Sequence, residues 1–461
     1  MTWTNITSEG FKADDNNIPF SQAMRAVLAG KNVFLTGEAG TGKTTFLTML
    51  RDHLEKTTNK TVVVLAPTGI AAVNAGGQTI HSMFRLPFKP LVMSDSMFRM
   101  SYKGDERNKT TIWSSFKYSL DRIHMLNCID LLIIDEVSMV RVDILQALDR
   151  LLRVHRKAYD KPFGGIQMLL VGDAFQLPPV VTEAESTILN QFYDHHFFFG
   201  SEAFREAKFE GHILTKVYRQ QDSKFLGLLN RIREGEMTVA DAAVLESKRT
   251  RPTNEEGFVI ISTTREKVGS MNLARLNALP SPAKRFVAEI DGEFPESRYP
   301  MAAVVDLKLG AQVMITKNDR QLGVYNGTLA KVVGFGEGMV EVEVLDNNSG
   351  LRVALEHVVW ENRVYEFNGQ TGNVDSKVVG TFRQMPITLA WALTVHKSQG
   401  KTFDKVIADV EQSFDYGQEY VALSRCRSLE NLHLMSGVNA GRLGPHPIVR
   451  RFYNRHFSSA R

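Results

Sequence analysis

The chain has 461 residues, 43% of them hydrophobic and 23% charged, a composition typical of a globular protein with roughly three domains. Its formal net charge of +4 is too small for charge alone to indicate nucleic-acid binding, and no apolar run approaches the roughly 20 residues of a membrane-spanning helix. The two cysteines, Cys128 and Cys426, lie in neither a disulfide framework nor a metal-binding spacing, which favours a reducing compartment.

A glycine-rich stretch follows the first strongly apolar run. Residues 32–35 lead into Gly37–Thr45, and a helical pattern over 46–54 leaves it, so the spacing G-x-x-x-x-G-K-T lies between a strand and a helix. Glycines let backbone N–H groups surround a phosphate, and the start of the helix adds its dipole. Lys43 is expected to reach the β- and γ-phosphates of a nucleotide, and the Thr44 hydroxyl is expected to hold Mg²⁺. The predicted nucleotide-binding set is Gly37, Gly40, Thr41, Gly42, Lys43, Thr44 and Thr45.

A second strand is predicted over 61–66. Pro67 and Thr68 follow at its carboxyl end, the edge at which α/β sheets bind ligands. Residues 79–84 then supply small hydrogen-bond donors together with His81 and Phe84. Residues 85–120 have no long periodic pattern, and we interpret them as an insertion carried by the first domain.

Two carboxylates end the strand predicted over 131–134. Asp135 suits Mg²⁺ held through water, and Glu136 suits the polarisation of an attacking water molecule. A helical stretch over 142–155 leads into a basic run, which is either a solvated helix face or a functional segment. After the next strand, 168–171, Gln176 lies on a strand-end loop from which it could sense a γ-phosphate.

Strands and helices alternate up to about residue 209, which predicts a parallel sheet. A second α/β unit is expected to begin near 212–215 and carries Arg219 and Arg425. It is interrupted over 296–383 by short alternating strands and turns such as Asn326-Gly327, which predict a small antiparallel β-barrel. The predicted fold is α/β, with one parallel-sheet domain over 1–209, a second over 210–295 and 384–461, and the barrel between the two parts of the second. A nucleotide in the cleft between the units would contact both, so hydrolysis would change the width of the cleft.

In combination these motifs resemble a superfamily 1 helicase of the 5′→3′ branch, which also contains the RecD proteins, and within it the Pif-type DNA helicases. The segment from Asp149 through Lys157 to Gln167 resembles the signature that distinguishes this family from other helicases. The matching stretches are Gly37–Thr45, Ala66–Ala72 with Thr79–Phe84, Ile134–Met139, Gly172–Val180, Leu214–Gln220, Leu393–Thr402 and Tyr420–Arg427.

The resemblance implies two RecA-like motor domains that use ATP and Mg²⁺. It implies that Lys43, Asp135, Glu136, Gln176, Arg219 and Arg425 take part in turnover, with Thr44 and Asp135 at the metal, Gly400 near the γ-phosphate and Gln22 as a candidate adenine-reading residue. Single-stranded DNA is expected on Pro67, Thr68, His81, Phe84, Thr394 and His396. The 85–120 insertion would act as a strand-separating wedge and the barrel as a channel wall.

The expected partners are single-stranded DNA and forked or structured DNA, with no membrane, and the chain is expected to be a monomer. The expected compartment is the cytoplasm with the bacterial nucleoid, or the nucleus or a mitochondrion in a eukaryote. One alternative is a DNA-stimulated ATPase or translocase subunit that does not unwind alone. Another is a phosphate-loop ATPase that acts on protein. A third, a non-enzymatic nucleic-acid-binding module, is disfavoured by the carboxylates and arginines.

Overall fold

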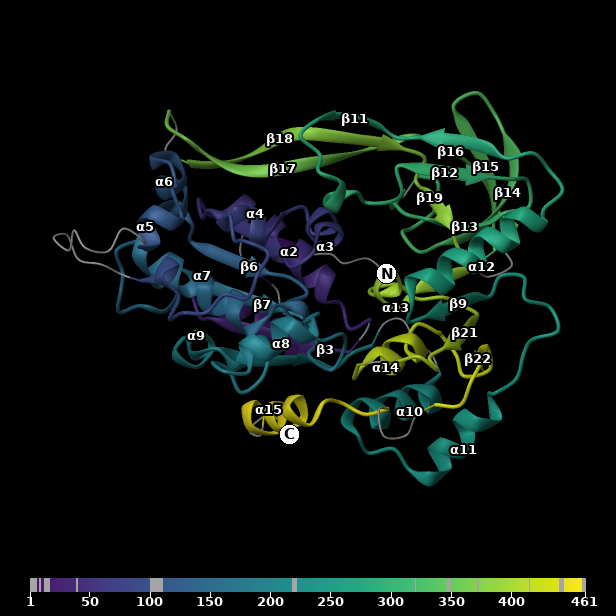
Figure 1. Ribbon diagram of the computed structural model, residues 1–461, viewed down its shortest axis with the longest axis horizontal. Coiled ribbons are helices and arrows are strands. Elements are labelled where there is room, and N and C mark those ends of the chain that lie inside the picture. Colours follow the sequence, from purple (N-terminus) through teal and green to yellow (C-terminus); the bar gives the residue numbers. More distant parts are fainter. Residues whose placement is uncertain are drawn as a thin grey trace.

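The computed structural model describes residues 6–7, 10–11, 17–38, 40–99, 111–217, 222–319, 321–345, 350–370, 373–413, 415–438 and 443–457. Two α/β units lie beside each other, and a group of antiparallel strands extends over both of them (Figure 1). Within the described part of the chain, none of the helices combines the length and the apolar character that crossing a membrane requires.

The first unit is built on a six-stranded parallel sheet with the strand order β5-β4-β6-β7-β3-β8. Its strands are β3 (Val33–Gly37), β4 (Val62–Ala66), β5 (Gln78–Thr79), β6 (Leu131–Ile134), β7 (Gln167–Val171) and β8 (Glu210–Leu214). Its helices are α1 (Ile18–Leu28), α2 (Lys43–Thr57), α3 (Gly69–Asn74), α4 (Ile80–Phe84), α5 (Ile112–Ser115), α6 (Leu120–Cys128), α7 (Val142–His155), α8 (Glu183–Leu189) and α9 (Glu202–Glu206).

Both faces of this sheet are covered, which explains why its strands are nearly continuous apolar runs. Val33 and Leu35 of β3 pack into one apolar cluster with α1 and α2. Phe34, on the opposite face of the same strand, packs into a second cluster with α7. The described parts of the 85–120 insertion also enter this second cluster, through Leu91 and Phe98 among others.

Two segments that the sequence division assigned to the second unit belong to the first. β8 pairs in parallel with β3 from Val33↔Glu210 to Gly37↔Leu214, so it is the edge strand of the first sheet. The C-terminal helix α15 (Pro447–His456) also packs here, and Tyr453 shares a hydrogen bond of 2.6 Å with the Thr36 hydroxyl. The division at residue 209 therefore falls one strand too early, because β8 completes the first sheet before the chain crosses over.

The second unit has a four-stranded parallel sheet with the order β20-β9-β21-β22. Its strands are β9 (Val259–Ser262), β20 (Ala392–Thr394), β21 (Val406–Asp409) and β22 (Leu432–Leu434). Its helices are α10 (Ser223–Glu234), α11 (Val239–Ser247), α12 (Arg265–Ala278), α13 (Val395–Ser398) and α14 (Gln418–Leu423). The predicted α/β class with two parallel sheets is confirmed.

The antiparallel insert divides its strands among three sheets that share one apolar core. The largest sheet has the order β16-β15-β14-β13-β19, with β13 (Gln312–Ile315), β14 (Leu329–Phe335), β15 (Met339–Val344), β16 (Arg352–Glu356) and β19 (Ile387–Leu389). The other two are β10 (Lys284–Val287) with β12 (Val304–Leu307), and β11 (Glu289–Gly292) with β18 (Asn373–Gln384) and β17 (Val358–Asn368). The insert thus begins before residue 296 and is not one continuous sheet.

The long β17–β18 hairpin extends from the insert across the first unit towards α6 (Figure 1). Its Tyr365 hydroxyl accepts a hydrogen bond of 3.2 Å from the Val64 N–H of β4. Further along the hairpin, the ring of Phe367 lies 5.1 Å from the ring of His124 on α6. These contacts connect the insert to the sheet that carries the phosphate loop.

Candidate functional site

The phosphate loop connects β3 to α2, as the sequence predicted. Gly40 and Gly42 have φ values of +84° and +92°, a region that side-chain-bearing residues rarely adopt, so glycine is required at both turns. The Lys43 Nζ donates to the carbonyl oxygens of Gly37 and Glu38 at 2.7 and 2.9 Å, which folds the lysine over the loop. Thr44 and Thr45 are exposed in the first turn of α2, a turn that contains no acidic side chain. The loop therefore presents a positive helix end and a lysine to an anionic group.

The carboxylates Asp135 and Glu136 lie at the end of β6, two strands from β3 in the same sheet. Glu136 has a φ of +52°, a strained conformation for a residue with a side chain, and its N–H donates to the Asp135 carboxylate at 2.9 Å. Burial raises the pKa of Glu136, and the adjacent Asp135 carboxylate raises it further, whereas Lys43 and Arg425 act in the opposite direction. Burial also raises the pKa of Asp135. Lys43 and Arg425 are thus both near enough to act on Glu136, although they come from different units.

A direct contact between the units is made at Glu136. The Gln399 side chain, just after α13 of the second unit, donates from Nε2 to Glu136 Oε2 at 3.0 Å. Arg425 is fully buried, and its guanidinium donates to the carbonyls of Val421 at 2.8 Å and Lys401 at 3.3 Å. Gln399 lies inside the matching stretch Leu393–Thr402 but was not among the predicted site residues. One glutamine carries no local signal that distinguishes it from a surface residue.

A second contact between the units surrounds Gln176, which is buried and donates from Nε2 to Asp173 at 3.4 Å. Asp173 is also paired with Arg233 of α10 in the second unit, at 3.2 Å. The Arg233 guanidinium lies 4.3 Å from the centre of the Phe175 ring. Gly417 packs so closely here that a β-carbon would come within 2.5 Å of the Gln176 carbonyl oxygen. Neither Asp173 nor Arg233 was predicted from the sequence, because a single charge on a strand-end loop, such as Asp173, or on an amphipathic helix, such as Arg233, is usually solvated.

The remaining residues that were predicted to contact the nucleotide differ in their structural environment. Gly400 is exposed with a φ of +75° and directly follows Gln399. Gln22 is exposed on α1. Arg219 lies outside the described residues.

Most of the predicted DNA-binding residues lie where helices begin after strands. Thr68 and Thr394 are the N-caps of α3 and α13, so their hydroxyls accept hydrogen bonds from Ala71 N–H at 3.3 Å and Lys397 N–H at 3.2 Å. Pro67, His81 and His396 are partly exposed. Burial lowers the pKa of both histidines, which favours the neutral ring.

Two of the predicted DNA-binding residues are buried, Thr394 at 5% exposed and Phe84 more deeply. Phe84 is the clearer disagreement. Its side chain is fully buried in the apolar cluster of the first unit. It therefore has no exposed surface on which a base could stack, in contrast to the prediction. A phenylalanine at the end of a short amphipathic helix satisfies the core, and the sequence alone does not distinguish this from an exposed ring.

The basic run at the end of α7 is not simply a solvated helix face. Arg153 pairs with Asp149 at 2.8 Å, and Asp149 also accepts the Phe163 N–H at 2.6 Å. Arg156 donates to the Gly164 carbonyl at 2.9 Å. These arginines close the segment 149–167 onto itself, and the backbone of this segment turns through positive φ values at Lys157 and Phe163.

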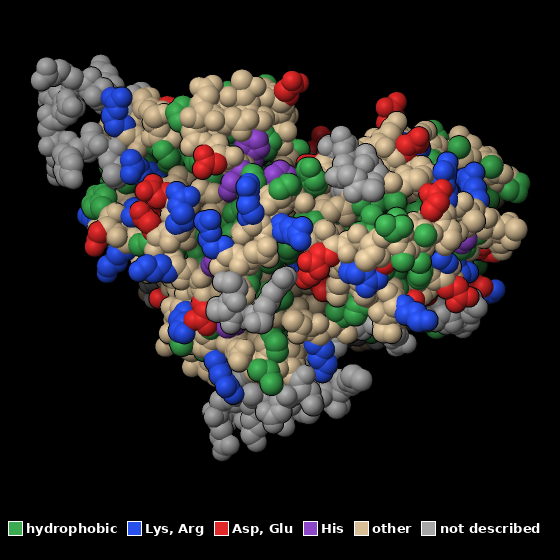
Figure 2. Space-filling model, turned by 90° about the horizontal axis from the view of Figure 1, so that it is seen from below, with side chains coloured by type: hydrophobic (Ala, Val, Ile, Leu, Met, Phe, Trp, Pro, Cys, Tyr) green, Lys and Arg blue, Asp and Glu red, His purple; other side chains and the backbone are tan. Residues whose placement is uncertain are grey.

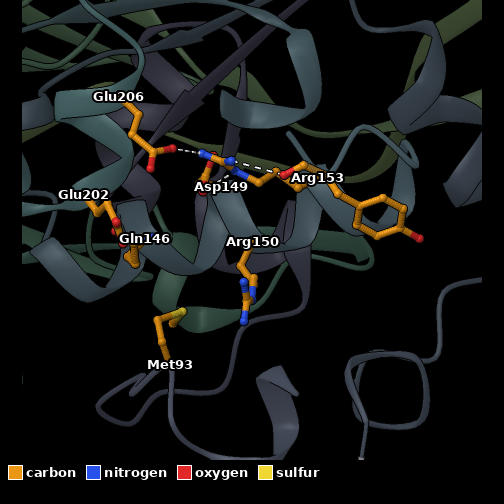
Figure 3. Close-up of a pocket in the computed structure, with 8 residues that line it drawn as sticks. Met93, Gln146, Asp149, Arg150, Arg153, Glu202 and Glu206 are labelled. Atoms are coloured by element: carbon orange, nitrogen blue, oxygen red, sulfur yellow. Dashed lines mark hydrogen bonds and ion pairs between the residues drawn. The ribbon is translucent and has the colours of Figure 1, made fainter. Parts of the chain in front are cut away.

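A cavity of about 310 Å³ lies against this helix, away from the phosphate loop (Figure 3). Arg150 points into it from α7, and Met93, Glu202 and Glu206 line its other sides. The face shown in Figure 2 has basic and acidic side chains interspersed rather than gathered into one basic belt, in keeping with the small net charge.

The site fits a nucleoside triphosphate with Mg²⁺. Lys43 and the open helix end suit phosphate oxygens, and the Thr44 hydroxyl and Asp135 carboxylate are the oxygen ligands that Mg²⁺ prefers. Glu136 stands beside them with a carboxylate held by the second unit. This arrangement is suited to phosphoryl transfer to water at an interface between two units.

Comparison with known proteins agrees with this geometry. A family model described as PIF1-like helicase matches residues 14–243. The ATP-dependent DNA helicase PIF1 of Danio rerio is 34% identical over 427 residues, covering 89% of this chain and 60% of that protein, so the chain spans about three fifths of its relative. The structure of Bacteroides sp Pif1 in complex with ADP-AlF4 is 36% identical with a TM-score of 0.85, over 96% of this chain and 97% of that one. The structure of Bacteroides Pif1 bound to ssDNA is also 36% identical, and the match covers 96% of this chain and 97% of that one with a TM-score of 0.64. The chain belongs to the PIF1-like helicase family.

Proposed function

We propose that this chain is an ATP-dependent DNA helicase that moves 5′→3′ on single-stranded DNA and separates duplex or structured DNA. The observation that carries the proposal is the hydrogen bond from Gln399 to Glu136, because it joins the proposed catalytic carboxylate of one unit to the other unit. A change at the nucleotide would then alter the contact between the units. A strand of DNA lying across both units would be moved by that change.

The proposed roles follow from the positions of the side chains. Bound ATP supplies the phosphoanhydride bond, and Mg²⁺ neutralises charge on its phosphates. Lys43 and Thr44 hold the phosphates and the metal, with Asp135 as the second metal-binding group. Glu136 orients the attacking water and accepts its proton, a role that the raised pKa of its carboxyl favours.

The second unit completes the proposed site. Arg425, together with Arg219, would stabilise charge that develops on the γ-phosphoryl oxygens, and Gln176 would sense the same group. Gly400 follows Gln399 and leaves room for a phosphate, since nothing lies within 4 Å of a β-carbon built there. Gln22 is the proposed adenine-reading residue.

The proposed DNA track runs along Pro67, Thr68 and His81 of the first unit and Thr394 and His396 of the second. His81 follows β5, the edge strand of the first sheet, and Pro67 and Thr68 follow its neighbour β4. Thr394 ends β20, the edge strand of the second sheet, and His396 lies in the helix after it, which supports a single surface across both units. The relatives support DNA as the substrate, because the Bacteroides protein has been captured with single-stranded DNA. The direction of movement rests on the resemblance in segment 149–167 and on the inserted antiparallel strands.

The proposed acting unit is a monomer, because one chain supplies every residue assigned to turnover. The proposed subcellular location is the compartment that holds the DNA, which in a bacterium is the cytoplasmic nucleoid. Light scattering of the purified chain, with and without a single-stranded oligonucleotide, measures the oligomeric state. A stable dimer in both conditions would contradict the monomer.

Strand displacement tests the proposal directly. The purified chain is mixed with ATP, Mg²⁺ and a duplex that carries a single-stranded tail at either its 5′ or its 3′ end. We expect release of the displaced strand from the 5′-tailed duplex only, and none from either substrate with Lys43→Ala. Unwinding of the 3′-tailed duplex alone would contradict the direction. DNA-stimulated ATP turnover without strand release would assign the chain to the translocases instead.

A further inference from the structure

The loop that follows α4 carries an unusually exposed aromatic ring. Phe88 is 88% exposed, the highest value of any aromatic side chain in the described ranges. Exposing an aromatic ring to water is unfavourable, but single exposed apolar side chains are common on protein surfaces. Three further features of this loop show that the ring is presented in a defined position.

The ring has one partner and one open face. Phe88 stacks on His81, with 4.7 Å between the ring centres and 5° between the planes. His81 lies in α4, directly after the edge strand β5, at the part of the sheet where the proposed DNA track begins. Among the described residues no other ring or cation covers Phe88, so its outer face is open to solvent.

The loop backbone is anchored on both sides of the ring. Leu86 and Leu91 are 4% and 0% exposed, and prolines 87 and 90 restrict the residues between them. The Asp143 carboxylate accepts the Leu91 N–H at 2.8 Å.

A buried charged group completes the anchor. Arg141 donates to the Lys89 carbonyl at 3.1 Å and pairs with Asp143 at 2.7 Å and with Glu185 at 2.6 Å. Both Arg141 and Asp143 are buried. The structure thus uses a buried ion-pair network to hold a loop whose most prominent side chain makes one stacking contact.

We propose that Phe88, supported by His81, is a stacking platform for one nucleobase of the bound DNA. The inference rests on the proposed function. It adds a stacking contact that does not depend on the base sequence of the DNA. Every base has an apolar face, and a ring that is already ordered loses little freedom on binding. The base comes either from the single strand or from the end of the duplex, and both present the same flat face.

Affinity for a mixed-sequence single-stranded oligonucleotide, measured by fluorescence anisotropy, tests the platform. We expect Phe88→Ala to weaken binding about 5- to 100-fold, the usual range for loss of one base–aromatic stack. Phe88→Trp keeps a flat ring and should bind within about 3-fold of the unchanged protein. Phe192→Ala removes another exposed phenylalanine, 50% exposed, and should leave the affinity unchanged.

A scan with one abasic site at a time locates the base. In the unchanged protein, an abasic site at one nucleotide position should weaken binding, because the base that stacks on Phe88 is missing. In Phe88→Ala, an abasic site at the same position should cause no further loss of affinity. The slope of log affinity against log salt should stay the same, because no phosphate contact is lost. If Phe88→Ala loses affinity for a tailed duplex but not for the single strand, the stacked base belongs to the end of the duplex.

Identical abasic profiles in Phe88→Ala and the unchanged protein on both substrates would overturn the platform. Failure of the unchanged protein to bind single-stranded DNA would instead contradict the proposed function. Because Phe88 is almost fully exposed, the thermal midpoint of Phe88→Ala should match that of the unchanged protein. A weaker but equally stable variant therefore reports on binding.

Discussion

Arg233 is the side chain whose removal should most weaken the contact between the two units. It comes from α10 of the second unit, is 7% exposed, and pairs with Asp173 of the first unit, which is 1% exposed. Burial by itself lowers the pKa of the Arg233 guanidinium, but Asp173, with smaller contributions from Tyr420, Tyr453 and Glu38, raises it by more, and the pKa is raised overall. Asp173 therefore needs a positive partner in an environment with little water.

We expect Arg233→Ala to destabilise the protein by about 3–5 kcal/mol, because it leaves the Asp173 charge buried and unpaired. For a cooperative unit of the size of the first α/β unit, this corresponds to a fall of roughly 6–20 °C in the melting temperature, at about 2–4 °C per kcal/mol. Differential scanning calorimetry measures the shift. The double variant Arg233→Met with Asp173→Asn removes both charges and should recover a large part of the loss.

Arg249→Ala is the matched control. Arg249 also pairs with a carboxylate, that of Glu246 at 3.2 Å, but both side chains are more than half exposed. Such a pair contributes about 0–1 kcal/mol, so the melting temperature should barely change. If Arg233→Ala melts like this control, or if the double variant is no more stable than Arg233→Ala, the buried pair does not hold the units together.

Three further outcomes follow from the site. Lys43→Ala should abolish ATP turnover while leaving affinity for single-stranded DNA intact, and measurable turnover would remove Lys43 from the phosphate-binding group. Arg425→Ala should reduce DNA-stimulated turnover by about 10³–10⁵-fold with a much smaller effect on nucleotide affinity, as for other arginines that stabilise a transferring phosphoryl group; near-normal turnover would contradict that role. Log affinity for single-stranded DNA should fall linearly with log salt, with a slope of about −0.7 per phosphate neutralised, and a flat response would exclude a groove that follows the backbone.

The parts of the site that depend on neighbouring residues were predictable from the sequence. The glycines, Lys43 and Thr44 lie within one strand–turn–helix segment, and their spacing determines the shape of the backbone. Asp135 and Glu136 follow a run of four apolar residues, which shows a buried strand that ends in two carboxylates. The alternation of strands and helices was enough to predict the α/β class.

The parts that depend on distant residues were not predictable. The sequence of β8 would suit an edge strand of either sheet, and only its pairing with β3 places it in the first unit. Phe84 and Phe88 are four residues apart in one aromatic segment, yet one ring is buried and the other is 88% exposed.

By itself the sequence determined the phosphate loop, the paired carboxylates and the fold class, because each is encoded by residues that are close together along the chain. Only the tertiary structure decided that Gln399 meets Glu136 and that Arg233 meets Asp173. In each pair the partners are far apart in sequence and come from different units. A single polar side chain has no local pattern, and its role depends on the surface that folding brings opposite to it.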